Sequence, residues 1–232
     1  MDKIFYSMCR KELAVVLVSG GMDSCVTASI AAIDYSLAFL HLNYRQRTEK
    51  REHKAFNDLC DFFKPLKRLE VDVSYFSQIG GSALTDRNID VPVSGVKEGI
   101  PATYVPFRNA HLLCIATSWA EVIGAKKIYI GAVEEDSSGY PDCRESFYNA
   151  FQEAISRGTR PESDIKIVTP LIHKSKAEIV KIGIHLGSPF ELTWSCYKDE
   201  EIACGECDSC ILRLKGFKEA GFEDKIPYRE KR

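Results

Sequence analysis

The fold is decided by the stretch Leu13-Ala-Val-Val-Leu-Val-Ser-Gly-Gly-Met-Asp-Ser24. Its first six residues are aliphatic, which is typical of a strand buried on both faces of a parallel sheet. The two glycines allow a sharp turn, and the small residues from about Cys25 to Ile33 predict a helix. A buried strand, a glycine turn and a helix in this order predict a loop that binds phosphate with the backbone N–H groups at the start of the helix.

Strands and helices alternate along the rest of the chain. Further strands are predicted at Ser36–Leu42, Leu69–Val73, Lys127–Gly131 and Ile165–Val168. Helices are predicted at Thr48–Phe63, Asn109–Gly124, Glu145–Arg157, after the capping box Ser175–Glu178, and near Ile211–Ala220. Residues 74–106 read as a long functional loop. This alternation predicts an α/β fold with a doubly wound, mostly parallel five-stranded sheet.

The periodicity changes near Ser188, which divides the chain into an ATP-binding α/β domain (1–187) and a small metal-binding segment packed on it (188–232). The 232 residues are 45% hydrophobic and 28% charged, with a net charge of −2. This balance argues against a nucleic-acid partner, which needs a basic face. No stretch reaches the roughly 18 apolar residues of a membrane span, and none reads as a signal peptide. We expect a cytoplasmic protein whose nine cysteines stay reduced.

The glycine turn is the candidate nucleotide site. We expect Ser19, Gly20, Gly21, Met22, Asp23 and Ser24 to bind the phosphates of ATP. The serine hydroxyls add donors, and Asp23 orients the loop or helps to hold Mg²⁺. The sequence contains neither a Walker motif nor a dinucleotide fingerprint. The alternative is a plain strand-to-helix turn that an Asp or Ser side chain caps.

Four cysteines lie close together near the C-terminus. Cys196, Cys204, Cys207 and Cys210 have the spacing C-x7-C-x2-C-x2-C, and four thiolates can close a tetrahedral Zn²⁺ site. Iron–sulfur proteins use similar spacings, so the pattern leaves an iron–sulfur cluster open. Most of the other cysteines fall in predicted helices or core and are expected to act as small apolar side chains.

Several motifs occur in a recognisable order. They are Ser19-Gly-Gly-Met-Asp-Ser24, Tyr44-Arg-Gln-Arg47, Thr103-Tyr-Val-Pro-Phe-Arg-Asn109, Ser138-Gly-Tyr-Pro-Asp-Cys-Arg144, Lys176-Ala-Glu-Ile179, Thr193-Trp-Ser-Cys-Tyr197 and Cys204-Gly-Glu-Cys-Asp-Ser-Cys210. The first resembles the loop of the PP-loop ATP pyrophosphatases. Together they resemble the 7-cyano-7-deazaguanine synthase family over nearly the whole chain.

The resemblance implies an ATP-dependent ligase that converts 7-carboxy-7-deazaguanine and ammonia into 7-cyano-7-deazaguanine (preQ0) for queuosine biosynthesis. The reaction would pass through an adenylated carboxylate and an amide. It also implies bound zinc, which favours Zn²⁺ over iron–sulfur at the cysteines, and a homodimer.

Charged and polar residues in these motifs are candidates for the chemistry. We expect catalytic roles for Asp23, Arg108, Arg144 and Lys176. The arginines can pair with phosphate or carboxylate, and the alternative for each is a surface salt bridge. A lysine in the first turn of a helix opposes the helix dipole, which suggests that Lys176 meets an anion.

Three further residues are candidates for substrate binding: Asn109, Asp136 and Asp142. The alternative for Asn109 is a helix cap, and for the two aspartates it is a turn-forming role.

Two residues depart from the family pattern, because Arg45 and Phe107 stand where the family usually has glycine or a small residue. They leave open a related PP-loop enzyme that activates another carboxylate or attaches a deazapurine to a protein. A sulfur-transfer enzyme would need an exposed reactive cysteine near the loop, and none is evident. A zinc-binding module with an inactive nucleotide fold is the remaining class, and the intact loop motif argues against it.

Overall fold

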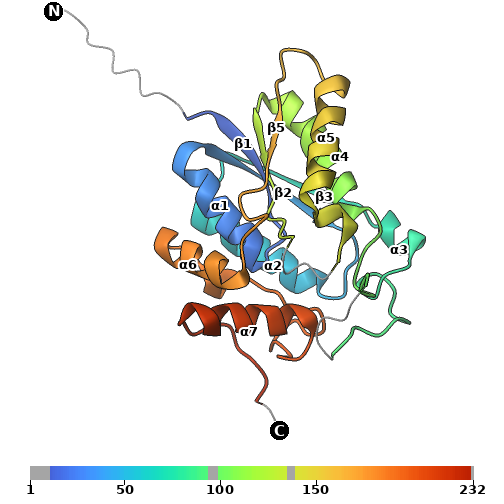
Figure 1. Ribbon diagram of the computed structural model, residues 1–232, viewed down its shortest axis with the longest axis vertical. Coiled ribbons are helices and arrows are strands. Elements are labelled where there is room, and N and C mark those ends of the chain that lie inside the picture. The colour runs from blue at the N-terminus through green and yellow to red at the C-terminus, as the bar shows by residue number, and fades with distance from the viewer. Residues whose placement is uncertain (1–10, 94–98, 135–138, 231–232) are drawn as a thin grey trace, which may run out of the picture.

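The computed structural model describes residues 11–93, 99–134 and 139–230, in which five parallel strands form one sheet in the order β3-β2-β1-β4-β5 (Figure 1). Every neighbouring pair is parallel. The strands are β1 (Leu13–Leu17), β2 (Ser36–Asn43), β3 (Lys67–Asp72), β4 (Lys127–Tyr129) and β5 (Lys166–Val168). The predicted doubly wound fold is therefore confirmed: the chain adds β2 and β3 on one side of β1, then crosses over to add β4 and β5 on the other.

Alternate residues of β1 feed two separate cores. Val15 and Leu17 pack with side chains of two helices on one face, whereas Ala14 and Val16 pack with side chains of two helices on the other. This is why the strand is aliphatic at every position. The first face is covered by α4 (Arg108–Ile123) and α5 (Glu145–Gly158), and the second by α1 (Met22–Asp34) and α2 (Glu49–Phe63).

The last two α-helices of the chain form a layer, and the first of the two packs against α1. Helix α6 (Lys176–Leu186) begins with the predicted capping box, in which Ser175 and Glu178 exchange hydrogen bonds. Helix α7 (Asp208–Ala220) lies alongside α6 (Figure 1). Their close approach requires Gly216, since a Cβ atom there would lie 2.7 Å from the Cβ atom of Lys176. The position of Lys176 is thus fixed by both helices.

The structure differs from the predicted elements at several helix starts. Helix α1 begins at Met22, with Gly21 as its N-cap, and not at Cys25 as predicted. Helix α7 begins at Asp208, with Cys207 as its N-cap, and not near Ile211. Three short helices also form: α3 (Tyr75–Ile79) within the predicted loop, and the 3₁₀ helices η1 (Pro141–Cys143) and η2 (Phe190–Leu192). Within the described ranges, no helix combines the length and the apolar character that crossing a bilayer demands.

Arg45 and Phe107 both adopt the left-handed backbone conformation, with φ angles of 59° and 57°. The family resemblance described above places glycine or a small residue at these two positions. This backbone conformation suits glycine, so Arg45 and Phe107 hold it under strain. A non-glycine residue in this region costs roughly 1–2 kcal/mol.

Replacing Arg45 with glycine should therefore stabilise the protein. Arg45 is exposed, and its side chain makes no hydrogen bond to another described residue that would be lost. After allowing for the entropy of glycine in the unfolded chain, the expected gain is roughly 0.5–1 kcal/mol, measured as free energy of unfolding in urea. Arg45→Ala keeps the Cβ atom and should gain nothing. Equal stabilisation by both variants would contradict the strain argument.

Candidate active site

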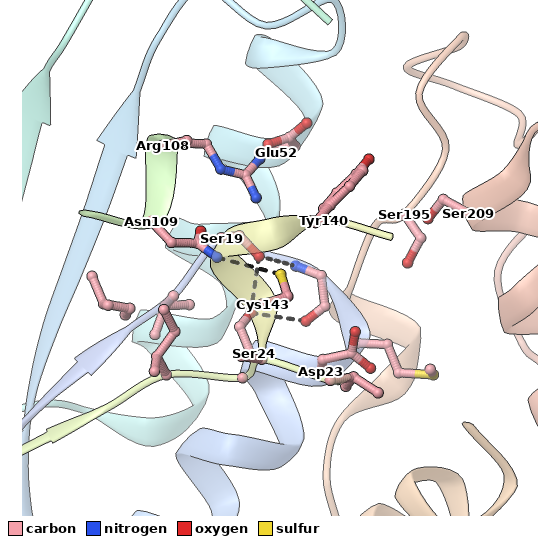
Figure 2. A pocket seen from close by; sticks show the side chains of 18 of the residues that line it. Ser19, Asp23, Ser24, Glu52, Arg108, Asn109, Tyr140, Cys143, Ser195 and Ser209 are labelled. Carbon is pink, nitrogen blue, oxygen red and sulfur yellow. Dashed lines mark hydrogen bonds between the residues drawn. The ribbon is translucent and has the colours of Figure 1, made fainter. Parts of the chain in front are cut away.

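A cavity of about 280 Å³ opens at the carboxyl ends of the strands, beside the point between β1 and β4 at which the order of the strands reverses. Ligands of doubly wound proteins bind at this type of position. Figure 2 shows the side chains that face it. Its wall is built from the start of α1, the ends of β2 and β4, the starts of α2 and α4, the η1 segment and the C-terminal segment.

The predicted phosphate loop forms the floor of this cavity. Gly20 has a φ angle of 87°, and a Cβ atom there would lie 2.8 Å from the carbonyl oxygen of Glu52, so only glycine fits. Ser19 accepts a hydrogen bond from the N–H of Gly21, and the Ser24 hydroxyl donates to the carbonyl of Gly21. The loop is therefore held in one shape before any ligand arrives, with the start of α1 facing the cavity.

Lys176 reaches this floor from α6. Its Nζ atom donates to Oδ2 of Asp23 at 2.8 Å, and both residues line the cavity. The other carboxylate oxygen of Asp23, Oδ1, is buried without a hydrogen-bond partner among the described residues. One anion that Lys176 meets is thus a carboxylate of the loop itself. An oxygen of this kind is a ligand that Mg²⁺ accepts.

Arg108 enters from the first turn of α4. Its Nη1 atom donates to the Tyr44 hydroxyl at 3.2 Å, and its guanidinium lies 5.7 Å from the centre of the Tyr44 ring. Its Nε atom is buried and has no hydrogen-bond partner in the described part of the chain. Arg108 therefore offers the cavity a positive charge and at least one unused donor.

Asn109 does not cap its helix, so that interpretation is wrong. The N-cap of α4 is Phe107, which places Asn109 inside the first turn. Its backbone N–H donates to the Asp142 carboxylate at 2.9 Å, and its side-chain amide donates to the Asp142 carbonyl at 2.8 Å. These bonds join α4 to η1, which positions Cys143 in the wall. Burial raises the pKa of the Cys143 thiol to about 11, so it stays protonated at neutral pH.

Glu52 was not predicted from the sequence, yet it faces the cavity from α2 (Figure 2). Its carboxylate accepts hydrogen bonds from Thr48 (2.9 Å) and Gln46 (3.0 Å). Burial raises its pKa from 4.5 to about 7, and these bonds, with the nearby charge of Arg108, only partly oppose the shift. A perturbed carboxyl in a cleft is a sign of function. The signal in the sequence was its place just after the Tyr44–Arg47 motif.

The C-terminal segment supplies the remaining wall. The N–H of Trp194 donates to the carbonyl of Gly20, which ties the segment to the phosphate loop. Arg213 is 1% exposed and binds Asp224 through two nitrogens, at 2.6 and 2.9 Å. It also donates to Thr193 and Ser195. This buried network fixes Ser195 at the edge of the cavity.

The four predicted metal ligands converge. The sulfur atoms of Cys196, Cys204, Cys207 and Cys210 all lie within 4.8 Å of one another. Cys207 and Cys210 sit at the N-cap and in the first turn of α7, so one helix end presents two of them. Four free thiols this close fit a bound metal ion, and because three of them are buried the site resembles a closed structural one.

Not every predicted residue lies at the cavity. Asp142 is buried behind Asn109, and Arg144 is exposed at the start of α5; neither is among the lining residues. Asp136 lies outside the described residues. Their proposed roles remain predictions. The lining residues that sequence reasoning missed include Glu52, Thr103, Tyr140, Tyr197, Asp208 and Arg213.

Comparison with known proteins identifies the family of this chain. The family described as "Queuosine biosynthesis protein QueC" matches residues 13–221, from β1 to the end of α7. The chain belongs to the QueC family. The match spans both the phosphate loop and the cysteine cluster, so the family features are present together in one chain.

Curated relatives of this QueC family member are similar over nearly their whole length. The "7-cyano-7-deazaguanine synthase" of Nautilia profundicola is 59% identical over 94% of this chain and 99% of its own. That of Nitratiruptor sp. is 57% identical over 93% of this chain and 98% of its own. That of Chloroherpeton thalassium is 57% identical, over 93% and 96% respectively.

The raised pKa of Glu52 predicts a stability effect that depends on pH. The folded protein holds this proton up to about pH 7, whereas the unfolded chain releases it near pH 4.5, so ionisation weakens the fold as pH rises between these values. Glu52→Gln cannot ionise. Its stability relative to the parent QueC protein should rise from pH 4.5 to 7 by on the order of 2 kcal/mol and then stay level. Urea unfolding at several pH values measures this difference. A stability difference between variant and parent that does not vary with pH would disprove the raised pKa of Glu52.

Loss of one cysteine ligand should release the metal. Cys207→Ser is expected to lower metal content to near zero, and to lower the free energy of unfolding by more than about 3 kcal/mol, because a closed site contributes directly to folding. Elemental analysis and thermal unfolding measure the two effects. Cys114 is exposed and distant in sequence from the cluster, so Cys114→Ser serves as the control and should retain both. Retained metal in the Cys207 variant would contradict this site.

Proposed function

We propose that this chain is an ATP-dependent ligase that converts 7-carboxy-7-deazaguanine and ammonia into 7-cyano-7-deazaguanine. The observation that carries the proposal is that the Thr103–Asn109 and Tyr140–Cys143 segments meet the phosphate loop in one cavity. One end of the cavity suits the phosphates of ATP, and the other offers polar groups for a base. The names of the relatives and the family match support the same assignment.

A carboxylate must be activated twice to become a nitrile. Its oxygen first attacks the α-phosphorus of ATP, which releases pyrophosphate and leaves an acyl adenylate. Ammonia then attacks the carbonyl carbon. AMP and a proton are released, and the product is an amide. The amide oxygen attacks a second ATP in the same way and releases pyrophosphate, and loss of AMP and of both protons on the nitrogen forms the carbon–nitrogen triple bond. Each step transfers an adenylyl group to oxygen or expels AMP, so one phosphate site serves both activations.

The residues of the cavity suit these steps by position and charge. The loop Ser19–Ser24 and the start of α1 stabilise the departing pyrophosphate. Lys176 lies where negative charge accumulates, held at Asp23. Arg108 offers its donors to oxygen atoms of the substrate or of the adenylate. We retain Asn109 and Asp142 as proposed substrate-binding residues and Arg144 as a proposed catalytic residue. Asn109 would contact the substrate directly, and Asp142 would act by positioning Asn109.

Metal ions and assembly complete the proposal. Zn²⁺ is the ion proposed for the four thiolates, where it would hold the C-terminal wall in place. Mg²⁺ is proposed at the triphosphate, with Asp23 as its protein ligand, where it would neutralise phosphate charge. The resemblance to the family supports a homodimer, and the free thiols favour a cytoplasmic location. We also propose that the ATP-binding domain ends at residue 187 and that the metal-binding segment begins at residue 188.

The direct test supplies purified protein with ATP, Mg²⁺, 7-carboxy-7-deazaguanine and ammonium, and follows products by mass spectrometry. The expected result is the 7-cyano base together with AMP and pyrophosphate, with the amide detected in single-turnover samples. Folded, metal-loaded protein that consumes no deazapurine would refute the proposed substrate.

Lys176→Met should remove catalysis while leaving the fold. The variant keeps the length of the side chain but loses the charge that faces the transferring phosphates. We expect kcat to fall at least about 100-fold, as when a group that stabilises transition-state charge is removed. The control is Lys174→Met, because Lys174 pairs with Glu178 and does not line the cavity. Equal activity of the two variants would show that Lys176 has no such role.

A further inference from the structure

Two groups with unused hydrogen-bonding capacity face the cavity near Tyr44. Glu52 is anchored by Gln46 and Thr48, and Arg108 is anchored by the Tyr44 hydroxyl. Figure 2 shows both side chains at the same end of the cavity, away from Asp23. Their charges interact, yet they form no ion pair within 4 Å among the described residues. An acceptor and a donor are thus held near each other without satisfying each other.

The other charged groups of the cavity are already engaged or differently placed. Arg213 uses its nitrogens on Asp224, Thr193, Ser195 and the carbonyl of Phe190. Asp23 and Lys176 pair at the phosphate loop. Asp208 is differently placed: it begins α7 directly after Cys207, beside the cysteine cluster, and its Oδ1 atom is buried without a hydrogen-bond partner among the described residues. Glu52 and Arg108 are therefore the pair that offers an anionic acceptor next to a cationic donor.

We infer that Glu52 and Arg108 together recognise the guanine-like edge of the base: the carboxylate accepts from the ring N–H and the 2-amino group, and Arg108 donates to the neighbouring ring carbonyl oxygen. A guanine edge presents two donors beside one acceptor, which matches this pair. Among the described residues, the Arg108 guanidinium donates only to the Tyr44 hydroxyl, through Nη1, so it has N–H groups left for the ring carbonyl oxygen. The Glu52 carboxylate, held by two neutral groups, gains two further donors. The inference rests on the proposed function and names residues that determine specificity within it.

A site of this kind discriminates strongly against a base that lacks a donor. When the 2-amino group is absent, the buried carboxylate loses a charge-assisted hydrogen bond, which corresponds to a roughly 10- to 100-fold loss. Glutamine at position 52 presents one oxygen and one NH₂ group, so it cannot accept from both donors of the base. The preference for the 2-amino group should therefore depend on Glu52 and not on Arg108, because the carbonyl oxygen is present with or without the amino group.

The test compares kcat/KM for 7-carboxy-7-deazaguanine and for its analogue without the 2-amino group. The parent enzyme should prefer the amino form at least about tenfold, and Glu52→Gln should reduce this preference to within about threefold. Arg108→Lys should lower kcat/KM for both bases while keeping the preference. Glu49→Gln removes a carboxylate from the same helix that binds Asn43 and does not line the cavity, so it is the matched control and should behave as the parent.

Distinct outcomes would overturn the inference. A Glu52→Gln enzyme that keeps the full preference would exclude Glu52 from recognition of the base. If Glu52→Gln keeps the preference and raises the KM for ammonium, Glu52 acts at the ammonia site and not at the base, and the inference is also overturned. If the parent enzyme binds and converts neither base, the proposed function fails and this inference fails with it. Urea unfolding of Glu52→Gln, expected to be more stable at pH 8, shows that any loss is not due to misfolding.

Discussion

The close packing of backbone around the phosphate loop is the constraint on which the rest of the structure depends. A Cβ atom at Gly131 would lie 2.9 Å from the backbone of Asp23, and one at Gly20 would lie 2.8 Å from that of Glu52. The end of β4, the start of α1 and the start of α2 can approach this closely only because these two positions are glycine. The same approach brings Glu52 beside the nucleotide loop. The C-terminal segment then binds the carbonyl of Gly20.

The sheet, the phosphate loop and the cysteine cluster could all be predicted from the sequence. The aliphatic run of β1 and the glycine turn predict the loop because their backbone conformation follows from local residue type. The four cysteines converge as their spacing predicts. Glu52 escaped prediction because its environment comes from residues distant along the chain, such as Arg108. The alternative role of Asn109 as a helix cap is wrong because the helix begins one residue before it, at Arg108.

The site concentrates features that do not favour folding. A carboxyl is buried with neutral partners, and Phe107, which precedes Arg108, has a left-handed backbone. Asp23 in the phosphate loop has a buried carboxylate oxygen that finds no hydrogen-bond partner in the described part of the chain. Groups left unsatisfied in the free protein are those that a ligand can satisfy, so the fold retains them at some loss of stability. The two well-packed cores on either face of the sheet offset this loss.

The buried pair Arg213–Asp224 also makes the cavity sensitive to a residue that it does not contain. The cavity takes one wall from residues 194–213, and Arg213 ties Ser195 in that wall to Asp224, which is not among the lining residues. A substitution at Asp224 would therefore leave every lining side chain in place and still free Arg213 to move. Mutations that change ligand binding need not lie at the binding site, and Asp224 is where such an indirect effect is expected.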